Sequence, residues 1–497
     1  MAVALDRRRF LKASAGLALG LGLAQVPGRV AAGAAPHAPS APPAAGDGVW
    51  QELARSLQGT LLRPGDPDYA RIARPWNLRF ASILPNGIAR CVSTDDVRTC
   101  LQWAQAHGVP LVARSGGHSY AGYSQTTDLM IDLSPMNQVT YDAKLGLAHM
   151  SGGARNSDVY ASLRTVGRTV THGRCAGVGV GGLVLGGGLG FNQRRLGLLC
   201  DQLVETVIVT AAGELLRCND QENADLFWAC RGGGGGNFGI NTAFTFQTFP
   251  AETLTVYLIT WTANLDALVP AALDLLPTTP ERLGCKLSVV NDGTRLSLEL
   301  LGQLVGPPDE LRALLAPLYR LATPAGETVR VTSYWDGQDF LSEDSSPEYT
   351  HERSRYVYQP LSAEGARTIL SFMRRWPGTR ADATWKIFLA GGTVTAVPPD
   401  ATAFVHRGAQ MVSSIELDWT PDDTVGTVAD NEAWLAEFHA AMAPFTSDES
   451  YQNFIDEAQS DYLRAYYGAN LERLVAVKRR YDPQNVFRFP QSIPLAL

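Results

Sequence analysis

The sequence contains little that would support a metal site or a nucleic-acid partner. None of its seven cysteines stands in a Cys-x-x-Cys pair, so zinc and iron–sulfur sites find no support. Charged residues make up 18% of the chain, the formal net charge is −7, and no run of Lys and Arg occurs beyond the extreme N-terminus. Nucleic acid and an anionic membrane surface are therefore excluded as expected partners.

The N-terminal apolar stretch is too short to span a bilayer. It covers Ala13 to Ala24, whereas a membrane-spanning helix needs about twenty apolar residues. It follows the basic segment Arg7 to Lys12 and precedes small residues from Val30 to Ala35, an order typical of a twin-arginine export signal. We expect a signal over residues 1–35, an Ala/Pro-rich linker over 36–49 and a secreted protein. A chance basic N-terminus is the alternative.

Twin-arginine export carries folded proteins, often with a cofactor inside, so it favours a bound cofactor. Export would also permit disulfides, but the cysteine spacing does not assign them. The odd count leaves one thiol without an intramolecular partner. The cysteines are Cys91, Cys100, Cys175, Cys200, Cys218, Cys230 and Cys285.

The chain is long enough for two packed domains, with 497 residues of which 45% are hydrophobic. Residues 50–250 alternate short apolar runs with glycine loops, and residues 251–450 carry long alternating strands. We expect an α+β fold whose second domain is an antiparallel sheet covered by helices on one face. A C-terminal segment over 451–497 follows. The expected strands lie at 87–92, 110–113, 129–133, 203–210, 285–290, 295–302 and 415–419, and the expected helices at 93–107, 309–321 and 470–481.

Glycine is abundant, at 48 residues, and gathers in three segments. The first is Arg114-Ser115-Gly116-Gly117-His118-Ser119-Tyr120, at the end of an expected strand. Two glycines there free backbone N–H groups to face a diphosphate, and Arg114 adds charge, which predicts an anion-binding nest. An ordinary tight turn explains this segment alone equally well.

The second segment runs from Gly173 to Gly190. Gly177, Gly179 and Gly182 fit the G-x-G-x-x-G spacing, but this pattern is weak alone and should open a βαβ unit. Here it follows Cys175 far inside the chain, so we reject a Rossmann fold. The density of glycines indicates backbone that lies flat against a large planar ligand.

The third segment, Asp225 to Ile240, contains five successive glycines from Gly232 to Gly236. Such a run costs backbone entropy on folding. A flexible linker is the alternative interpretation, but aromatic and β-branched residues flank the run too tightly for it. We therefore expect this segment to belong to the same ligand site.

In this order, the three segments resemble the berberine bridge enzyme-like branch of the vanillyl-alcohol oxidase flavoproteins. The tail is similar to that family at Tyr451-Gln452-Asn453, Ala465-Tyr466-Tyr467-Gly468 and Tyr481 to Phe487. The resemblance covers about Trp76 to the C-terminus and is closest in style to bacterial aclacinomycin oxidoreductase-like and oligosaccharide oxidase-like enzymes. It implies FAD as the cofactor. It also implies a p-cresol methylhydroxylase-type FAD-binding domain over 50–250 and a substrate-binding domain over 251–450.

The resemblance assigns roles to individual residues. The histidine of the family's Gly-Gly-His motif bonds the flavin 8-methyl carbon, which points to His118, and the cysteine that opens its glycine-rich segment bonds flavin C6, which points to Cys175. Relatives usually have Pro-Thr after this cysteine where this chain has Ala176-Gly177, and a small buried hydrophobe is the alternative role for Cys175. The other cofactor contacts implied are Arg114, Ser115, Gly116, Gly117, Ser119, Tyr120, Val178, Gly179, Gly181, Gly182, Ile240 and Asn453.

Tyr451 matches the family's catalytic tyrosine in a Tyr-x-Asn motif. A free tyrosine has a pKa near 10, so a base at neutral pH needs positive charge or hydrogen bonds that lower the value. An aromatic packing residue is the alternative. Val178 matches a position over the flavin near C4a. In the family, valine there accompanies fast reaction with oxygen and leucine accompanies dehydrogenase behaviour.

Some relatives place a second tyrosine or an acid in the strand before a Gly-Gly pair. The corresponding stretch, Thr384 to Ala390, has neither, which counts against a two-step oxidation and against the oligosaccharide type. Ala401 to Arg407 resembles another strand of the family, and we expect His406 and Arg407 to be structural. Four aromatic residues could stack on a sugar or polycyclic ring, although aromatics in a sheet are more often core. They are Trp335, Tyr356, Tyr358 and Trp385.

We expect a secreted FAD-dependent oxidase that takes hydride from an alcohol or sugar-type hydroxyl of a carbohydrate or glycosylated secondary metabolite. Its partners would be this small molecule and molecular oxygen, with hydrogen peroxide as product. Two alternatives remain: a flavin-carrying protein that sequesters a metabolite without turnover, and an oxidative cyclase or dehydrogenase. Tyr451 and Cys175, both intact, favour the oxidase over the binding protein.

Overall fold

The computed structural model describes residues 46–343 and 345–497. The predicted export signal, residues 1–35, and the linker up to residue 45 lie outside the described residues. Helix α2 (Asp47–Ser56) begins inside the predicted linker, so residues 47–49 are helical. No helix in the described ranges is long and apolar enough to cross a membrane.

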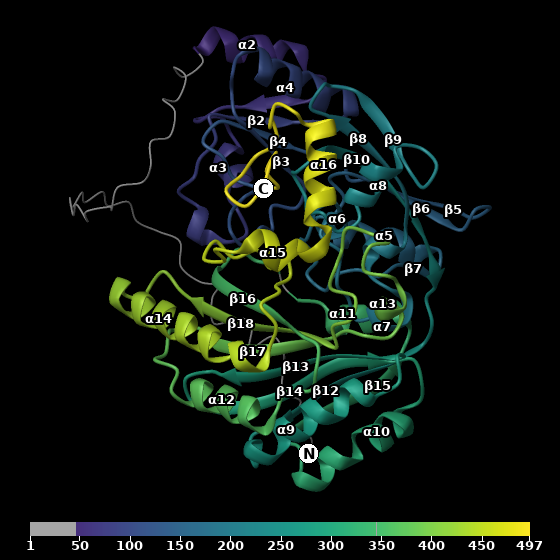
Figure 1. Ribbon diagram of the computed structural model, residues 1–497, viewed down its shortest axis with the longest axis vertical. Helices are drawn as coiled ribbons and strands as arrows, with labels where there is room; N and C mark the ends of the chain where they lie inside the picture. The colour runs from purple at the N-terminus through teal and green to yellow at the C-terminus, as the bar shows by residue number, and fades with distance from the viewer. Residues whose placement is uncertain (1–45, 344) are drawn as a thin grey trace. The chain divides into compact units, whose positions relative to one another are not determined.

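The first sheet of the fold has four strands in the order β1-β2-β4-β3, of which β2, β4 and β3 run parallel (Figure 1). It confirms the strands predicted at 87–92, 110–113 and 129–133 and the helix at 93–107. Helix α4 begins after Ser93 because the Ser93 Oγ accepts a hydrogen bond from the Asp96 N–H at 3.2 Å, as a helix N-cap does. The bounds are β1 (Thr60–Leu62), α3 (Tyr69–Ala73), β2 (Gly87–Arg90), α4 (Thr94–Ala106), β3 (Leu111–Arg114) and β4 (Leu129–Asp132).

The second sheet has five antiparallel strands in the order β5-β6-β10-β8-β9. Its strand β8 confirms the prediction at 203–210. The glycine segments run between and beside these elements. The bounds are β5 (Val139–Asp142), β6 (Leu147–Ser151), α5 (Asn156–Thr165), β7 (Arg168–Thr169), α6 (Val180–Leu185), α7 (Gln193–Leu196), β8 (Leu203–Thr210), β9 (Leu215–Cys218), α8 (Ala224–Ala229), β10 (Gly239–Gln247) and β11 (Phe249–Pro250).

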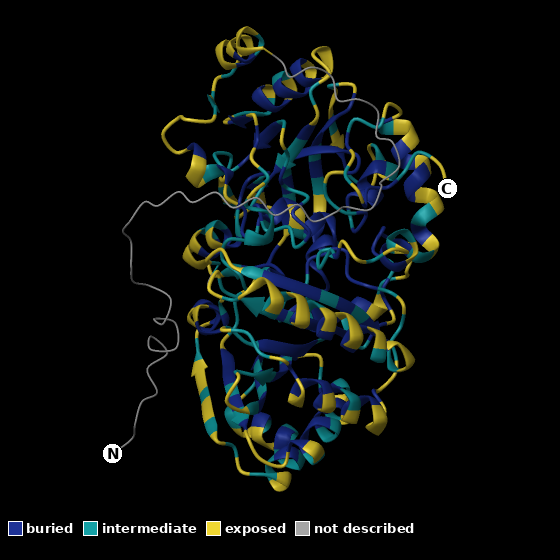
Figure 2. Cartoon of the chain, turned by 90° about the vertical axis from the view of Figure 1, so that its left-hand side faces the viewer, coloured by how far each residue is buried: buried dark blue, intermediate teal, exposed yellow. Residues whose placement is uncertain are grey.

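A seven-stranded antiparallel sheet follows, in the order β15-β12-β14-β13-β17-β18-β16. Helices α9, α10, α12 and α14 cover one of its faces (Figure 1), and Figure 2 shows buried strands beneath helices whose outer sides are exposed. The predicted antiparallel sheet with helices on one face is confirmed. The bounds are β12 (Leu254–Trp261), α9 (Leu265–Leu275), β13 (Leu283–Asn291), β14 (Leu296–Leu304), α10 (Pro308–Leu321), β15 (Gly326–Thr332), α11 (Tyr334–Leu341), β16 (Tyr349–Val357), α12 (Ala363–Arg374), β17 (Ala383–Leu389), β18 (Met411–Trp419) and α14 (Val425–Ala441).

Alternation along these strands separates two kinds of surface, because successive side chains of a strand point to opposite faces. Leu287, Trp385 and Ile415 point to the helices and are at most 3% exposed. The other face carries polar side chains and meets the glycine-rich part of the chain. There the Gln303 Nε2 donates a hydrogen bond to the Asn192 Oδ1 at 2.5 Å.

The strand predicted over Ala401 to Arg407 is wrong, because this stretch is a buried irregular loop. The Phe404 N–H donates to the Arg231 carbonyl at 3.1 Å, and the Arg407 guanidinium donates to both carboxylate oxygens of Asp201 at 2.7 and 2.8 Å. These contacts fix the side chains without a strand partner. The short helix α13 (Thr393–Ala396) precedes the loop.

The C-terminal segment forms α15 (Tyr462–Tyr467) and α16 (Leu471–Tyr481), which confirms the helix predicted at 470–481. Lys478 on α16 is completely buried. Its Nζ donates to the Asp482 Oδ2 at 2.7 Å and to the Asn237 carbonyl at 2.8 Å. The hydrogen bond to Asn237 joins the tail to the end of the five-glycine segment.

Candidate active site

The first two glycine segments pack against each other backbone to backbone. A β-carbon on Gly116 would lie 2.2 Å from the Gly179 nitrogen, and one on Gly179 would lie 2.3 Å from the Gly116 nitrogen. Both distances are far inside van der Waals contact, so only glycine fits at either position. Gly117 has φ +72°, a conformation that also favours glycine. Close packing of the two backbones thus explains part of the glycine density, in addition to the predicted planar ligand.

His118 follows this contact. Its ring stacks on Trp76 with centroids 3.9 Å apart and planes 20° apart. Its Nε2 is buried and has no hydrogen-bond partner among the described residues. Burial lowers the pKa of His118 to about 3, so the ring is neutral at pH 7 and one ring nitrogen keeps a free lone pair.

Cys175 lies in the neighbouring loop and is half-buried. A β-carbon on Gly177 would be 3.9 Å from the His118 Cδ2, so the Cys175 loop and the histidine share one site. Burial raises the pKa of the Cys175 thiol. The thiol donates a hydrogen bond to the Glu343 Oε2 at 3.4 Å. All seven cysteines lie within the described ranges, and none of them forms a disulfide.

The glycine segments leave bare backbone on one side. A β-carbon on Gly182 would have nothing within 4 Å, and one on Gly235 would come no closer than 3.8 Å to its neighbours. This open backbone and the unpartnered, buried nitrogen of His118 fit a large cofactor such as FAD. The residues that would hold it are His118, Cys175 and the loops 115–117, 177–182 and 232–236.

Two predicted cofactor contacts find other partners. The Arg114 Nη1 donates to the Ile72 carbonyl at 2.9 Å and its Nη2 to the Arg74 carbonyl at 2.8 Å. The guanidinium therefore supports the chain beneath the loop, and these bonds count against a contact with the diphosphate. Ile240 is 2% exposed and lies in the same apolar cluster as Phe487, which counts against direct contact with a cofactor.

The remaining predicted contacts lie around the two loops. The Ser115 Oγ donates to the Gly152 carbonyl at 2.8 Å, and the Ser119 Oγ accepts from the Tyr123 N–H at 3.0 Å. A β-carbon on Gly181 would also approach Gly152, at 3.1 Å from its carbonyl oxygen. The Val178 N–H donates to the Cys175 carbonyl at 3.3 Å, which keeps Val178 within the Cys175 turn. Contact of these residues with FAD stays a prediction.

Tyr451 lies where the second glycine segment meets the C-terminal segment. Its hydroxyl oxygen accepts hydrogen bonds from the Gly188 N–H at 3.1 Å and from the Asn453 Nδ2 at 3.0 Å. A β-carbon on Gly186 would lie 2.1 Å from the Asn453 Oδ1. The Asn453 side chain therefore requires glycine at position 186. Within the Tyr-x-Asn motif, Asn453 donates its hydrogen bond to the Tyr451 oxygen.

Two N–H donors favour the phenolate form of Tyr451, as the catalytic interpretation requires. Burial nevertheless raises the pKa of Tyr451 to about 12, although the bonds from Asn453 and Gly188 act to lower it. The side chain is 2% exposed. The chain by itself therefore holds Tyr451 as a neutral phenol at pH 7.

A buried ionic cluster lies on the seven-stranded sheet and is linked to Tyr451 through the ring of Phe454. Lys386 places its Nζ 2.8 Å from the Glu416 Oε2 and 3.2 Å from the Glu352 Oε1. Burial acts to lower the pKa of Lys386, but the two carboxylates hold it above its usual value. The Lys386 Nζ is 6.0 Å from the ring centre of Phe454, whose ring lies 5.1 Å from that of Tyr451.

Sequence reasoning missed these three residues. The strand before Gly391-Gly392, β17, has no carboxylate, but Glu416 on the adjacent strand β18 pairs in register with Glu352 on β16, one strand further on. Side chains on adjacent strands meet on one face at about 5 Å. The absence of an acid from β17 therefore does not by itself count against the oligosaccharide type, because β18 and β16 place two carboxylates on the same sheet. Polar residues at buried, alternating positions were the signal that could have revealed them.

The aromatic residues predicted as stacking candidates lie in packed surroundings. Trp385 is fully buried on the helix side of the sheet. Trp335 stacks on His172 at 5.5 Å, and Tyr356 stacks on His406 at 4.1 Å. The Tyr358 hydroxyl is hydrogen-bonded to Glu449. The core alternative therefore describes these residues best.

His406 and Arg407 are structural, as predicted. The His406 Nδ1 lies 2.8 Å from the Glu449 Oε2. Arg407 forms the ion pair with Asp201 described above. Both residues brace the loop that packs against Tyr451 through Phe404, whose ring centre is 6.4 Å from that of Tyr451.

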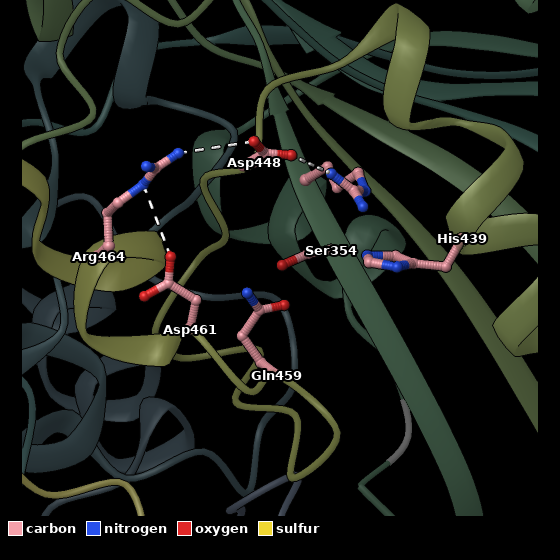
Figure 3. A pocket seen from close by; sticks show the side chains of 7 residues that line it. Ser354, His439, Asp448, Gln459, Asp461 and Arg464 are labelled. Atoms are coloured by element: carbon pink, nitrogen blue, oxygen red, sulfur yellow. Dashed lines mark hydrogen bonds and ion pairs between the residues drawn. The ribbon is translucent and has the colours of Figure 1, made fainter.

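A polar cavity of about 210 Å³ lies beside β16 (Figure 3). One lining residue, Ser354, also accepts a hydrogen bond from the Tyr451 N–H at 3.1 Å. Arg355 and Arg464 line the cavity as well, and both pair with Asp448. The other lining residues are His439, Gln459 and Asp461. Through Ser354, the wall of this cavity holds the backbone of Tyr451 in place.

Two protein families match the parts of the chain that build this site. The FAD binding domain family matches residues 85–219, and the family described as berberine and berberine like matches residues 450–494. The first range includes both loops with His118 and Cys175. The second includes Tyr451 and Asn453.

Known proteins are similar over nearly the whole described chain. An uncharacterized FAD-linked oxidoreductase of Bacillus subtilis, YgaK, is 34% identical over 446 residues, which cover 88% of this chain and 97% of that protein. The glucooligosaccharide oxidase of Sarocladium strictum is 31% identical over 441 residues, covering 81% and 86%. The solved structure of wild-type BBE-like 1 from Physcomitrella patens matches 90% of this chain and 99% of its own with a TM-score of 0.81 at 27% identity.

Proposed function

The chain belongs to the berberine bridge enzyme-like FAD-linked oxidoreductases, and on this premise we propose that it is an oxidase acting on a CH–OH group. FAD, when bound, supplies the hydride acceptor and the group that reacts with oxygen. The observation that carries the proposal is the Tyr451 hydroxyl, which two N–H donors hold between the glycine loops and a polar sheet face.

In this proposal Tyr451 takes the proton of the substrate hydroxyl. The hydrogen bonds from Gly188 and Asn453 hold its oxygen in place and favour the negative charge that develops on it. Because burial keeps the phenol neutral in the chain alone, ionisation of Tyr451 limits the rate at neutral pH. The rate should therefore rise with pH.

The polar sheet face supports a substrate rich in hydroxyl groups. Lys386 offers a donor group beside Phe454, and its partly exposed neighbour Glu416 offers an acceptor group, while the fully buried Glu352 pairs with Lys386 from within the sheet. The relative named glucooligosaccharide oxidase supports the same class. We propose a carbohydrate, or the sugar of a glycosylated secondary metabolite as in aclacinomycin oxidoreductase-like enzymes, as the substrate.

We further propose that FAD is attached covalently at His118 and Cys175. His118 offers a neutral ring with an unpartnered nitrogen, as a nucleophile requires. Cys175 lies in the adjoining loop. The proposal extends to export through the twin-arginine signal over residues 1–35 and to release of hydrogen peroxide outside the cytoplasm.

The test is peroxide release by the purified enzyme with a panel of free sugars, oligosaccharides and glycosides. We expect peroxide with at least one member of the panel and far less with the Tyr451→Phe variant. Substrate binding without flavin reduction across the panel would favour the sequestering protein. Flavin reduction without peroxide would favour the dehydrogenase.

A further inference from the structure

Cys175 has a hydrogen-bond partner from a distant segment of the chain, Glu343. The segment after α11 runs beside the Cys175 loop, and the Glu343 N–H donates to the Arg174 carbonyl at 3.1 Å. The Gly177 N–H donates to the Ser345 Oγ at 2.7 Å. These bonds bring the Glu343 carboxylate to the Cys175 thiol, at 3.4 Å between Sγ and Oε2.

Arg174 fixes the carboxylate. Its Nε donates to the Glu343 Oε2 at 3.0 Å, and a second guanidinium nitrogen pairs with the Oε1. The Arg174 side chain is only 14% exposed, whereas that of Glu343 is 48% exposed. The carboxylate thus contacts the thiol on one side and water on the other.

A thiol attacks as its thiolate, and burial, together with the neighbouring Glu343 carboxylate, raises the pKa of Cys175. Proton loss directly to bulk water is therefore disfavoured. Burial acts to raise the pKa of Glu343 too, but Arg174, Lys286 and Lys386 hold it below its usual range. The carboxylate is therefore charged and accepts a hydrogen bond from the thiol, and as a weak base it can hold the proton only briefly before water takes it.

We propose that Glu343, held by Arg174, receives the Cys175 proton and passes it to water while the sulfur is attached to the flavin. This inference rests on the proposed attachment at Cys175. One S–H and one ring C–H bond break and one C–S bond forms, which releases two protons and two electrons. Molecular oxygen takes both and becomes hydrogen peroxide. Glu343 is a positioning and proton-accepting residue of this attachment and has no part in turnover.

The test is mass mapping of the His118 and Cys175 peptides from denatured holoenzyme, sampled over time after expression. In the wild type both peptides should carry the flavin. In Glu343→Gln the His118 link should persist, and the Cys175 link should form on the order of tenfold to a hundredfold more slowly. The matched control is Asp339→Asn, which removes an exposed carboxylate of α11 and should match the wild type.

If the flavin is attached at Cys175 equally fast in Glu343→Gln and the wild type, only the role of Glu343 is overturned. A wild-type Cys175 peptide without flavin would overturn the second attachment as well. If Glu343→Gln does not fold, Glu343→Asp decides the question. Its carboxylate is one methylene shorter, so attachment at Cys175 should be slower than in the wild type, and an unchanged rate would contradict the proposal.

Discussion

Replacing Tyr451 by phenylalanine removes one oxygen atom and leaves two N–H donors without an acceptor. The Gly188 N–H and the Asn453 Nδ2 both donate to that oxygen in a site where Tyr451 is 2% exposed. A buried unsatisfied donor costs roughly 1–3 kcal/mol. Asn453 also donates to the Leu183 carbonyl, so we expect a loss of about 2 kcal/mol in the free energy of unfolding.

The effect on the reaction should be larger than the effect on folding. A positioned proton acceptor contributes on the order of a hundredfold or more, which corresponds to about 2.7 kcal/mol of activation free energy. Anaerobic stopped-flow reduction by substrate measures this step. The matched control is Tyr466→Phe, because Tyr466 is a fully buried phenol whose oxygen accepts a single N–H, that of Asp456. That variant should lose stability and keep the rate.

The pH profile separates Tyr451 from the carboxylates of the sheet. A base with a pKa near 12 is mostly protonated at pH 7, so kcat/KM should rise from pH 6 to 9.5 without a plateau. Tyr451→Phe should lose this rise. A plateau reached below pH 7, or wild-type rates in the variant, would refute the role of Tyr451 and show that another group is the base.

Three further predictions follow from the site. Acid-precipitated wild type should stay yellow and Cys175→Ala should keep its flavin through His118, whereas a colourless wild-type pellet would exclude covalent attachment. Val178→Leu adds a methylene in a close-packed turn and should slow reoxidation by oxygen while leaving reduction by substrate intact; equal oxygen rates would remove Val178 from the mechanism. Lys386→Met leaves the Glu352 carboxylate, fully buried, without its cation. That change should cost about 3–5 kcal/mol, seen as a lower melting temperature, and an unchanged Tm would show that Glu352 is protonated.

Local sequence signals predicted many of the elements well. The helix predicted at 93–107 is α4, and the Ser93 side chain caps it. The alternating runs of β13 and β14 were found because one side of each strand is apolar. These signals depend on neighbours in the sequence, so they need no knowledge of the tertiary structure.

The errors arose where distant contacts decide the structure. The stretch from Ala401 to Arg407 resembles a strand of the family, but Arg407 is held by Asp201, which lies 206 positions away. Arg114 follows a strand and precedes glycines, as an anion-binding residue should, yet its donors are used by Ile72 and Arg74. No local pattern contains either partner.

The site shows the same difference between residues found from local motifs and residues brought together by distant contacts. His118, Cys175 and Tyr451 carry motifs that identify them one by one, and the structure describes all three near the glycine loops. The ionic cluster of Lys386, Glu352 and Glu416 depends on the strand order β17-β18-β16, which the sequence does not state. The pairing of Cys175 with Glu343 spans 168 positions and has no motif at all.

The most direct test of the central claim, that this protein is an oxidase, needs no knowledge of its substrate. Purified holoenzyme is reduced by light without oxygen, mixed with air-saturated buffer, and followed for flavin absorbance and hydrogen peroxide. The account predicts rapid reoxidation with one peroxide released per flavin. A reduced enzyme that persists in air would contradict it and would make the protein a dehydrogenase or a flavin-carrying binding protein.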